Sequence, residues 1–484
     1  MSFVIYVGFG LLYLFILILG RLLNSETTFL AKSLLLTFYL ITEIIAIRME
    51  DRKNWIVSPV VLASVMTFIL GYGITNLIFF IPNSPPRDNL FLNLGNNAFN
   101  LLNTSMDSVI LGAVSMWVGY RTNLGITLFR LLTTGVINLK KLFRVTFDFK
   151  HALLYTFIVL SVLVRFYAIL IGVYGYAQSP EEISEAVKYS QYFYLLGLLA
   201  QYSLLIISLA YFSSEEQKNK KLFIALISVE VFFGFISGMK SLVVIPFVIP
   251  FVAYLVLKKR IKKSFLVLAI AAIVTAYIII EPFRILRNMD PNFQSSPKYI
   301  LQTMYDAYYL NEEVGLIKET DTEFFLFAFF GRNNYIIDAA KAIDYEDKVG
   351  LNRNDPDFSN RLFSIPLQAV LPRFIWVDKP LENIGLWFTQ KVYGRNYYSS
   401  TAMSPFGFLY FAGGNFLIIV IFFIFGVMQN ALFRFIELGS GGLIIFIGLL
   451  SSVVLIDSAV NTIFVEWIRL FPMLILLQYI TFKK

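Results

Sequence analysis

Apolar runs long enough to cross a lipid bilayer recur along the whole chain. A transmembrane helix needs about 20 mostly apolar residues, and such runs are centred on residues 3–20, 29–47, 56–82, 106–120, 152–174, 191–212, 222–238, 241–257, 264–281, 404–432, 441–457 and 463–480. Helices satisfy all of their own backbone hydrogen bonds in lipid, so runs of this length predict helices. We therefore predict an all-α polytopic membrane protein with about 12 transmembrane helices.

The composition supports this class and excludes several others. Of 484 residues, 57% are hydrophobic and only 15% are charged, whereas about a quarter of the residues in soluble domains are charged. A soluble enzyme, a disordered protein and a nucleic-acid binder are therefore excluded. The chain has no cysteine, His151 is its one histidine, and it has no Walker motif. We predict no metal site and no cofactor.

The placement of Lys and Arg predicts the orientation of the chain. Cytoplasmic connections of membrane proteins collect Lys and Arg, and one alternate set of connections holds 20 of them against 5 in the other set. The larger set is Arg48, Arg52, Lys53, Arg121, Arg130, Lys140, Lys141, Arg144, Lys150, Lys218, Lys220, Lys221, Lys258, Lys259, Arg260, Lys262, Lys263, Arg434, Lys483 and Lys484, and the smaller is Arg21, Lys32, Arg87, Lys188 and Lys240. Both termini are therefore predicted to be cytoplasmic.

One connection is far longer than the others. Residues 1–281 form spans 1–9 and residues 404–484 form spans 10–12, so residues 282–403 are predicted to lie outside the membrane as a single large loop. Long loops tend to carry function. The stretches 324–331 and 361–376, like the shorter external stretch 89–102, are rich in apolar residues. We expect helices there, at the outer membrane surface or packed over the bundle.

Charged residues within the predicted spans concentrate in the outer half of the membrane. Ionisable side chains in spans are costly and usually face a partner or a cavity. Arg165 and Glu230 lie at similar depth, and Glu466 and Arg469 share a helix face. These residues form either structural ion pairs or a polar, water-accessible site open to the outer face.

The segment EPFRILRNMD (281–290) is the best local cluster of charge. Pro282 suits the first turn of a helix, in which Arg284 and Arg287 would point the same way and could hold phosphate oxygens. A salt bridge of Glu281 with Arg284, with Arg287 reaching lipid headgroups, is the alternative. Further cations beside aromatic residues suit sugars and phosphates, or interfacial anchoring; they are Arg332, Arg361, Arg373, Lys379 and Arg395.

The chain resembles the bacterial oligosaccharide repeat-unit polymerases, the O-antigen (Wzy-type) family. The resemblance covers the architecture of about a dozen spans with one large external loop in the second half. Locally, SGMKSLVVIP (237–246) resembles the family's Gly-x-Arg hairpin, with Lys240 in place of the usual Arg. LPRFIWVDKP (371–380) resembles a Pro–aromatic–Lys-Pro stretch late in the loop, and residues 403–426 resemble the entry into the following span.

This resemblance implies a GT-C-like helical bundle and a metal-independent glycosyltransferase in the bacterial plasma (inner) membrane. The enzyme would transfer a glycan from a polyprenyl diphosphate carrier to a lipid-linked repeat unit at the outer face. Donor and acceptor lipids, membrane lipids, a chain-length regulator and a flippase are the implied partners.

Transfer needs cations for the leaving diphosphate and a base for the acceptor hydroxyl. The predicted catalytic residues are Arg284 and Arg287, with Glu281 and then Asp378 as candidate bases. The predicted substrate-binding residues are Arg165, Lys240, Arg332, Arg361, Arg373 and Lys379. A flippase or other transporter of lipid-linked oligosaccharide is the main alternative. An O-antigen ligase is another, although that family commonly has an external His and His151 is predicted to be cytoplasmic.

Overall fold

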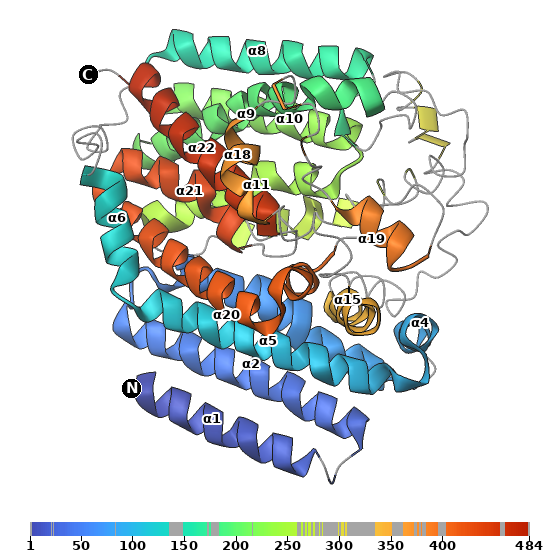
Figure 1. Ribbon diagram of the computed structural model, residues 1–484. Coiled ribbons are helices and arrows are strands. Elements are labelled where there is room, and N and C mark those ends of the chain that lie inside the picture. Colours follow the sequence, from blue (N-terminus) through green and yellow to red (C-terminus); the bar gives the residue numbers. More distant parts are fainter. Residues whose placement is uncertain are drawn as a thin grey trace. The chain divides into compact units, whose positions relative to one another are not determined.

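A computed structural model gives the arrangement of the helices (Figure 1). It describes residues 2–20, 22, 24–82, 84–134, 149–171, 174–175, 183–214, 216–258, 334–350, 362–371, 384–394, 403–454 and 460–482, with scattered positions between 263 and 306 and at 375, 376 and 379. The secondary structure of these residues is helical, apart from one isolated bridge between Phe149 and Phe482. The protein is therefore all-α, as predicted.

Within the described residues, eight helical stretches are long and apolar enough to cross a membrane, so the chain is a multi-pass membrane protein by helix length and hydropathy. These stretches are Ser25–Glu50, Pro59–Phe80, Pro85–Arg121, His151–Leu170, Leu195–Ser214, Lys240–Lys258, Pro405–Leu438 and Ile463–Thr481. Shorter apolar helices occupy Ile5–Leu19, Leu124–Thr134 and Ser440–Val454. The predicted span 222–238 forms helix α10 (Gln217–Ile236), which is not among the eight, and the predicted span 264–281 lies largely outside the described residues.

The chain divides into two compact units. Unit 1 comprises residues 1–140, 321–437 and 449–473, and unit 2 comprises residues 141–320, 438–448 and 474–484. The boundaries of these units differ from the predicted boundaries at residues 281 and 403. The predicted boundaries describe membrane topology and stay a prediction.

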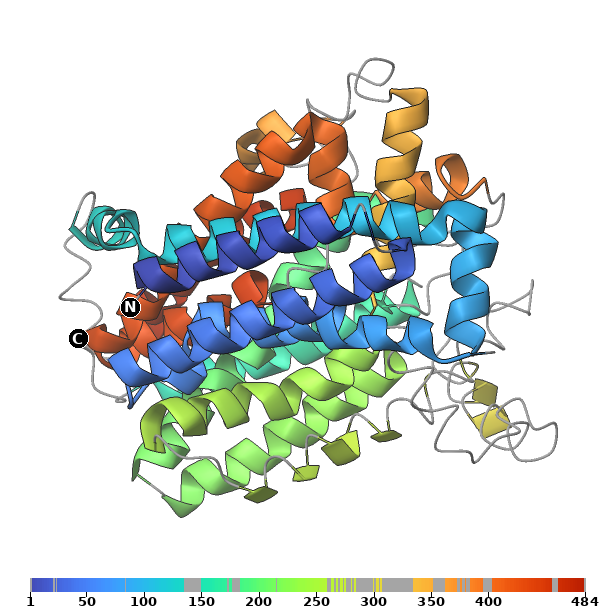
Figure 2. The same ribbon diagram turned by 90° about the horizontal axis from the view of Figure 1, so that it is seen from below.

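Unit 1 is built on three helices that lie side by side, joined by the long helix α20 (Figures 1 and 2). The three are α1 (Ser2–Leu19), α2 (Ser25–Glu50) and α5 (Ala98–Arg121), and α20 covers Pro405–Arg434. Glycines let α5 and α20 approach closely, because a Cβ atom on Gly426 would lie 1.9 Å from the carbonyl oxygen of Met116.

The other elements of unit 1 are shorter. They are η1 (Trp55–Val57), α3 (Pro59–Ala63), η2 (Ser64–Gly73), η3 (Ile74–Phe80), α4 (Pro85–Leu94), η4 (Gly95–Asn97), α6 (Leu124–Thr134), α15 (Ile336–Val349), α18 (Ile365–Val370), α19 (Gly385–Lys391) and η6 (Phe435–Leu438). The last of these, η6, directly follows α20. The predicted helices in 361–376 and 89–102 are present as α18 and as α4 with the start of α5. The stretch 324–331 lies outside the described residues.

Short sequence signals explain where several of these helices begin. Asn24 accepts a hydrogen bond from the Thr27 amide at the start of α2. Ser84 and Ser404 begin α4 and α20 in the same way, and each is followed by a proline, which fits the first helical position. Gly350 ends α15 in the left-handed region, where glycine is favoured.

Unit 2 contains four long helices that pack on one another. They are α8 (His151–Leu170), α9 (Ile183–Ser214), α10 and α11 (Lys240–Lys258). Ile169, Phe233 and Ile236 form a buried cluster where α8 meets α10. The helices α21 (Ser440–Val454) and α22 (Val460–Thr481) contribute residues to both units.

The two ends of unit 1 carry different segments, and each end has an ion pair. At the start of α2, Glu26 pairs with Arg87 of α4 at 2.9 Å, and α4 in turn contacts α15. At the other end of α2, Glu50 pairs with Arg121 of α5 at 3.0 Å. Because α2 has 26 residues at about 1.5 Å each, these ends are about 39 Å apart. The predicted orientation assigns the α4–α15 end to the outside.

Single-cysteine labelling tests this orientation, and the natural chain offers no competing thiol. Cysteine at Lys348 in α15, whose side chain is 70% exposed, should react with a membrane-impermeant maleimide on intact cells. Cysteine at Lys53, exposed at the opposite end of unit 1, should react only after the membrane is permeabilised. Labelling of position 53 but not of 348 on intact cells would reverse the predicted topology.

Candidate functional site

Three of the ten predicted site residues lie within the described part of the chain. They are Arg165, Lys240 and Lys379. The other seven lie outside the described residues and stay predictions; they are Glu281, Arg284, Arg287, Arg332, Arg361, Arg373 and Asp378.

Arg165 is buried in unit 2 and held by an ion pair. Its Nη1 lies 2.5 Å from Oε1 of Glu230, and its Nη2 donates to Oε2 of Glu230 at 3.1 Å and to the carbonyl oxygen of Gly197 at 2.6 Å. The guanidinium also lies over the ring of Phe233, 5.3 Å from its centroid. The pairing of Arg165 with Glu230 that equal depth predicts is therefore confirmed. These contacts occupy two of the guanidinium's three nitrogens and fix its position.

Lys240 is the first residue of α11 and follows a tight turn, as the hairpin motif predicts. Gly238 has φ 63°, and Ser237 accepts a hydrogen bond from the Met239 amide at 3.1 Å. Gly175 packs against this turn so closely that a Cβ atom there would lie 2.4 Å from the carbonyl oxygen of Ser237. The turn therefore has a fixed backbone. Lys240 as a whole is partly exposed, whereas its Nζ atom is buried.

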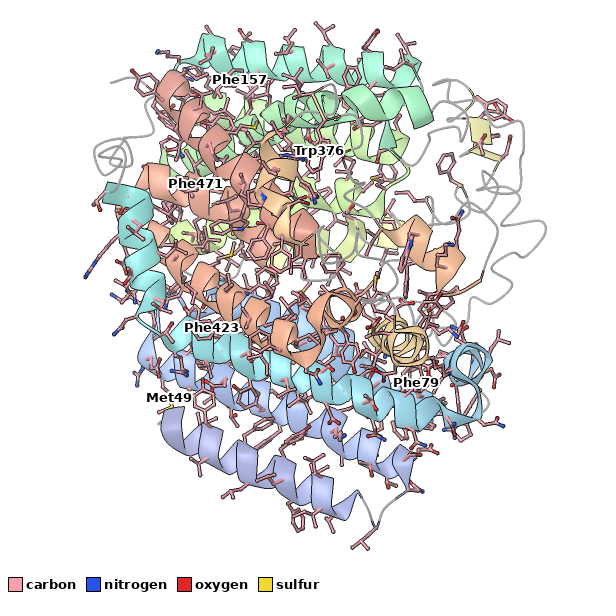
Figure 3. All side chains as sticks on the ribbon, viewed as in Figure 1. Met49, Phe79, Phe157, Trp376, Phe423 and Phe471 are labelled. Atoms are coloured by element: carbon pink, nitrogen blue, oxygen red, sulfur yellow. The ribbon has the colours of Figure 1, made fainter. Side chains whose placement is uncertain are left out.

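Lys379 is buried and closes the loop that the family resemblance singles out. Its Nζ donates to the carbonyl oxygen of Leu371 at 3.0 Å, and its amide donates to that of Trp376 at 3.1 Å. These contacts join the two ends of the 371–379 loop. Figure 3 marks Trp376 of this loop beside α18.

Arg469 of α22 anchors the helix that leads into this loop. It donates to the carbonyl oxygens of Gln368 at 2.9 Å and of Ala369 at 3.1 Å, in the last turn of α18. A cation at the carboxyl end of a helix is favourable because the last carbonyls carry partial negative charge. Helix α18, which lies within the predicted loop 282–403, is thus tied to the candidate membrane span Ile463–Thr481.

Helix α15, which lies within the predicted loop 282–403, packs against other helices of unit 1. Its small residues Ala339, Ala340 and Ala342 are fully buried, and Ala342 meets Gly407 of α20, where an added Cβ would lie only 2.6 Å away. On its polar side, Lys341 donates to the carbonyl oxygen of Asn93 in α4 at 3.0 Å.

Two further hydrogen bonds tie α15 to neighbouring segments of unit 1. Asp338 accepts from the hydroxyl of Tyr393, which follows α19, at 2.5 Å, and Asp347 accepts from Tyr410 of α20 at 3.1 Å. Sequence reasoning missed α15. Its run of small residues between charged ones was the available signal.

Two helical stretches of unit 1 that contact α15 or the residues before it are interrupted. In the first, the hydrogen-bond pattern changes to that of a π-helix over Ser64–Gly73 and then to that of a 3-10 helix over Ile74–Phe80. In the second, α20 has non-helical backbone at Gly413 and Gly414, and Gly414 has φ 64°. Interrupted helices and π segments often occur at functional sites.

The first interruption is stabilised by residues that directly precede α15. The Tyr335 amide donates to the carbonyl oxygen of Gly71 at 3.1 Å. The Asn334 amide group donates to Oδ1 of Asn76 at 2.9 Å, and Asn76 donates to Ser33 of α2 at 2.9 Å. These buried amides and hydroxyls join α2, the interrupted helix and the residues that precede α15.

We compared the chain with protein-family models, with curated proteins and with solved structures. None of them matches. Function must therefore be inferred from the chain's own residues. The structure shows a buried, mutually hydrogen-bonded polar cluster at the α4–α15 end of unit 1, formed by Ser33, Asn76 and Asn334. The predicted cations of residues 281–287 lie outside the described residues.

Proposed function

We propose that the chain is a metal-independent membrane glycosyltransferase, a polysaccharide polymerase. It transfers a glycan from a polyprenyl diphosphate carrier to a lipid-linked repeat unit at the outer face of the bacterial plasma membrane. The proposal includes about 12 spans, both termini in the cytoplasm, and the 282–403 segment outside. Arg284 and Arg287 hold the donor diphosphate, and Glu281 or Asp378 is the base.

The observation that carries this proposal is the packing of α15, from the predicted loop 282–403, against other helices within unit 1. Helix α15 buries three alanines there and makes hydrogen bonds to α4, α20 and the residue after α19. Arg469 and Lys379 hold α18 and the 371–379 loop. A loop that is fixed at this many points can present groups to a lipid-linked substrate with defined geometry, which transfer chemistry requires.

A transporter of lipid-linked oligosaccharide is the second candidate, and one observation favours it. Transporters place interrupted helices around their substrate sites, and unit 1 contains interruptions at 64–80 and at 413–414. In a transporter these interruptions would lie beside the translocated headgroup, and no bond of the substrate would be broken.

Proteoliposomes distinguish the two functions. Purified protein is reconstituted with one fluorescent lipid-linked repeat unit in both leaflets, and the lipid products are separated by size. The polymerase proposal predicts products of two and more units. A transporter leaves the substrate at one unit. It moves lipid from the inner leaflet to the outer one, where a membrane-impermeant quencher reaches it, so the remaining fluorescence falls faster than without protein. Quenching without longer products would overturn the polymerase proposal in favour of transport.

Replacement of the two proposed diphosphate ligands gives the largest expected effect on activity. Removing one pre-placed donor to developing negative charge typically lowers a rate by about 10²–10³-fold. Arg284→Ala and Arg287→Ala should each reduce polymer by this factor at an unchanged amount of protein in the membrane. Lysine variants keep the charge but lose the paired geometry, and should retain intermediate activity.

The matched control for these variants is Lys348→Ala in α15, whose side chain is exposed. This variant should polymerise normally. Wild-type rates in both arginine-to-alanine variants would place the diphosphate site elsewhere.

A further inference from the structure

Helix α6 crosses the end of unit 1 instead of running along it. It begins at Leu124, three residues after α5 ends at Arg121. Figure 1 shows it running across the direction of α5 and α20, and Figure 2 shows it nearly end-on beside the same helices. Its 11 residues span about 17 Å, which is too short to cross a bilayer. Because α5 and α20 lie in stretches long enough to cross a membrane, a helix that crosses their end would run along the membrane surface.

One face of α6 is packed and the other is apolar but open. On the packed face, Gly125 lies against Asn430 of α20, and Phe129 makes an edge-to-face contact with Phe435, 5.2 Å between ring centroids. On the open face, Leu124 is 52% and Leu131 is 62% exposed. Arg130 is exposed beside them. Leucines with a neighbouring cation are typical of helices that lie in a lipid headgroup layer.

The same end of unit 1 carries an excess of exposed positive charge. Arg48, Arg52, Lys53 and Arg130 are exposed and make no ion pair with the residues that the structure describes. Figure 3 marks Met49, beside Arg48, at the end of unit 1 where α6 lies.

The carboxylates at this end already have partners. Glu43 and Glu50 both pair with Arg121, at 2.6 Å and 3.0 Å. Asp51 accepts hydrogen bonds from the backbone amides of Lys53 and Asn54, and Glu437 pairs with Arg434. The exposed cations therefore have their charge available to an external anion.

We propose that α6 and the last turn of α2 with the turn after it form a binding surface for anionic phospholipids. Leu124 and Leu131 enter the boundary between headgroups and acyl chains. Arg130, with Arg48, Arg52 and Lys53, binds the headgroup phosphates. This interaction is independent of the polymerase proposal, since it needs only the surface described here.

The depth of α6 in the membrane is the first test. Single cysteines at Leu131 and Lys348 carry a spin label, in full-length protein in nanodiscs of phosphatidylcholine with phosphatidylglycerol. The label at 131 should collide more often with oxygen than with a water-soluble nickel chelate, and the label at the exposed position 348 should do the reverse. Equal exposure of both labels to the chelate would overturn the placement of α6 at the membrane surface.

The second test measures the preference for anionic lipid. A fluorophore at cysteine 131 is quenched by brominated phosphatidylglycerol or brominated phosphatidylcholine at equal mole fraction. The proposal predicts stronger quenching by the anionic lipid. Each of the variants Arg48→Gln, Arg52→Gln, Lys53→Gln and Arg130→Gln should lower the affinity for phosphatidylglycerol relative to phosphatidylcholine by about fivefold. Lys348→Gln is the matched control and should change nothing.

Two results of the second test would overturn the proposal. One is equal quenching by the two lipids in the unsubstituted background. The other is full displacement of the anionic lipid by inorganic phosphate, compared with chloride at the same ionic strength, which would assign the surface to free phosphate.

Discussion

Replacement of Arg165 by leucine is expected to destabilise the protein by about 3–5 kcal/mol, because it leaves Glu230 buried and unpaired. Both side chains are at most 6% exposed, and the ion pair between them is 2.5 Å long. The measurement is the thermal unfolding midpoint of purified protein in detergent. Arg52→Leu, at an exposed arginine, is the control and should change stability by less than about 0.5 kcal/mol.

The double variant Arg165→Leu with Glu230→Leu separates a structural role from substrate binding. Replacing both members of a buried pair by apolar residues is often close to neutral, so the double variant should recover most of the lost stability. Recovered stability with lost polymer would favour the predicted substrate role of Arg165. We infer that Arg165 stabilises the protein because it neutralises the buried Glu230. A double variant that is as unstable as Arg165→Leu would contradict this inference.

Gly426→Ala should destabilise unit 1 by about 3 kcal/mol or more, the upper range for overpacking a close interface. A Cβ atom there would lie 1.9 Å from the carbonyl oxygen of Met116 and 2.6 Å from the amide nitrogen of Tyr120, both on α5. Backbone atoms cannot move aside as a flexible side chain can, so α5 and α20 must separate. The unfolding midpoint should fall, and expression of folded protein should fall with it.

Gly10→Ala is the matched control for this substitution. Gly10 is also in a helix of unit 1, and nothing lies within 4 Å of a Cβ added there. Alanine has the higher helix propensity by up to about 1 kcal/mol, so this variant should be as stable as the unsubstituted protein or slightly more so. Equal stability of the two variants would contradict the close crossing of α5 and α20.

Hydropathy predicted the helices but not their interruptions. The stretch SVMTFILGYG reads as a continuous apolar span, and its π-helical hydrogen bonding has no hydropathy signal. The Gly71 carbonyl is bonded by Tyr335, which lies far away in sequence. Contacts of this range depend on how the large loop docks, which no local pattern in the chain encodes.

The pairing of buried charged residues was predictable where two of them lie at the same depth in their predicted spans, and less so elsewhere. Arg165 and Glu230 could be paired because each lies in the outer half of its predicted span. Lys32 was counted with the external connections, yet it lies within α2, is 3% exposed and pairs with Asp107 of α5 at 2.5 Å. Its partner Asp107 lies at the start of the predicted run 106–120, and no spacing in the sequence links the two residues. The amphipathic α6 was missed because a basic connection was expected there.

The seven predicted site residues outside the described part of the chain leave the chemistry to be tested by reaction. The central claim is that this chain alone joins lipid-linked repeat units. The most direct measurement is the mass of the product after purified protein is incubated in detergent with one defined polyprenyl-diphosphate-linked repeat unit and excess EDTA. Detergent removes the two compartments that transport requires, so an increase in substrate mass by one repeat unit reports bond formation.

The polymerase proposal predicts a ladder of products that differ by one repeat unit, with release of one polyprenyl diphosphate for each bond formed, in the presence of EDTA. A ladder that appears only when a divalent cation is restored would contradict the metal independence. Substrate that stays at one unit, with protein that retains its cooperative unfolding transition, would contradict the proposed reaction.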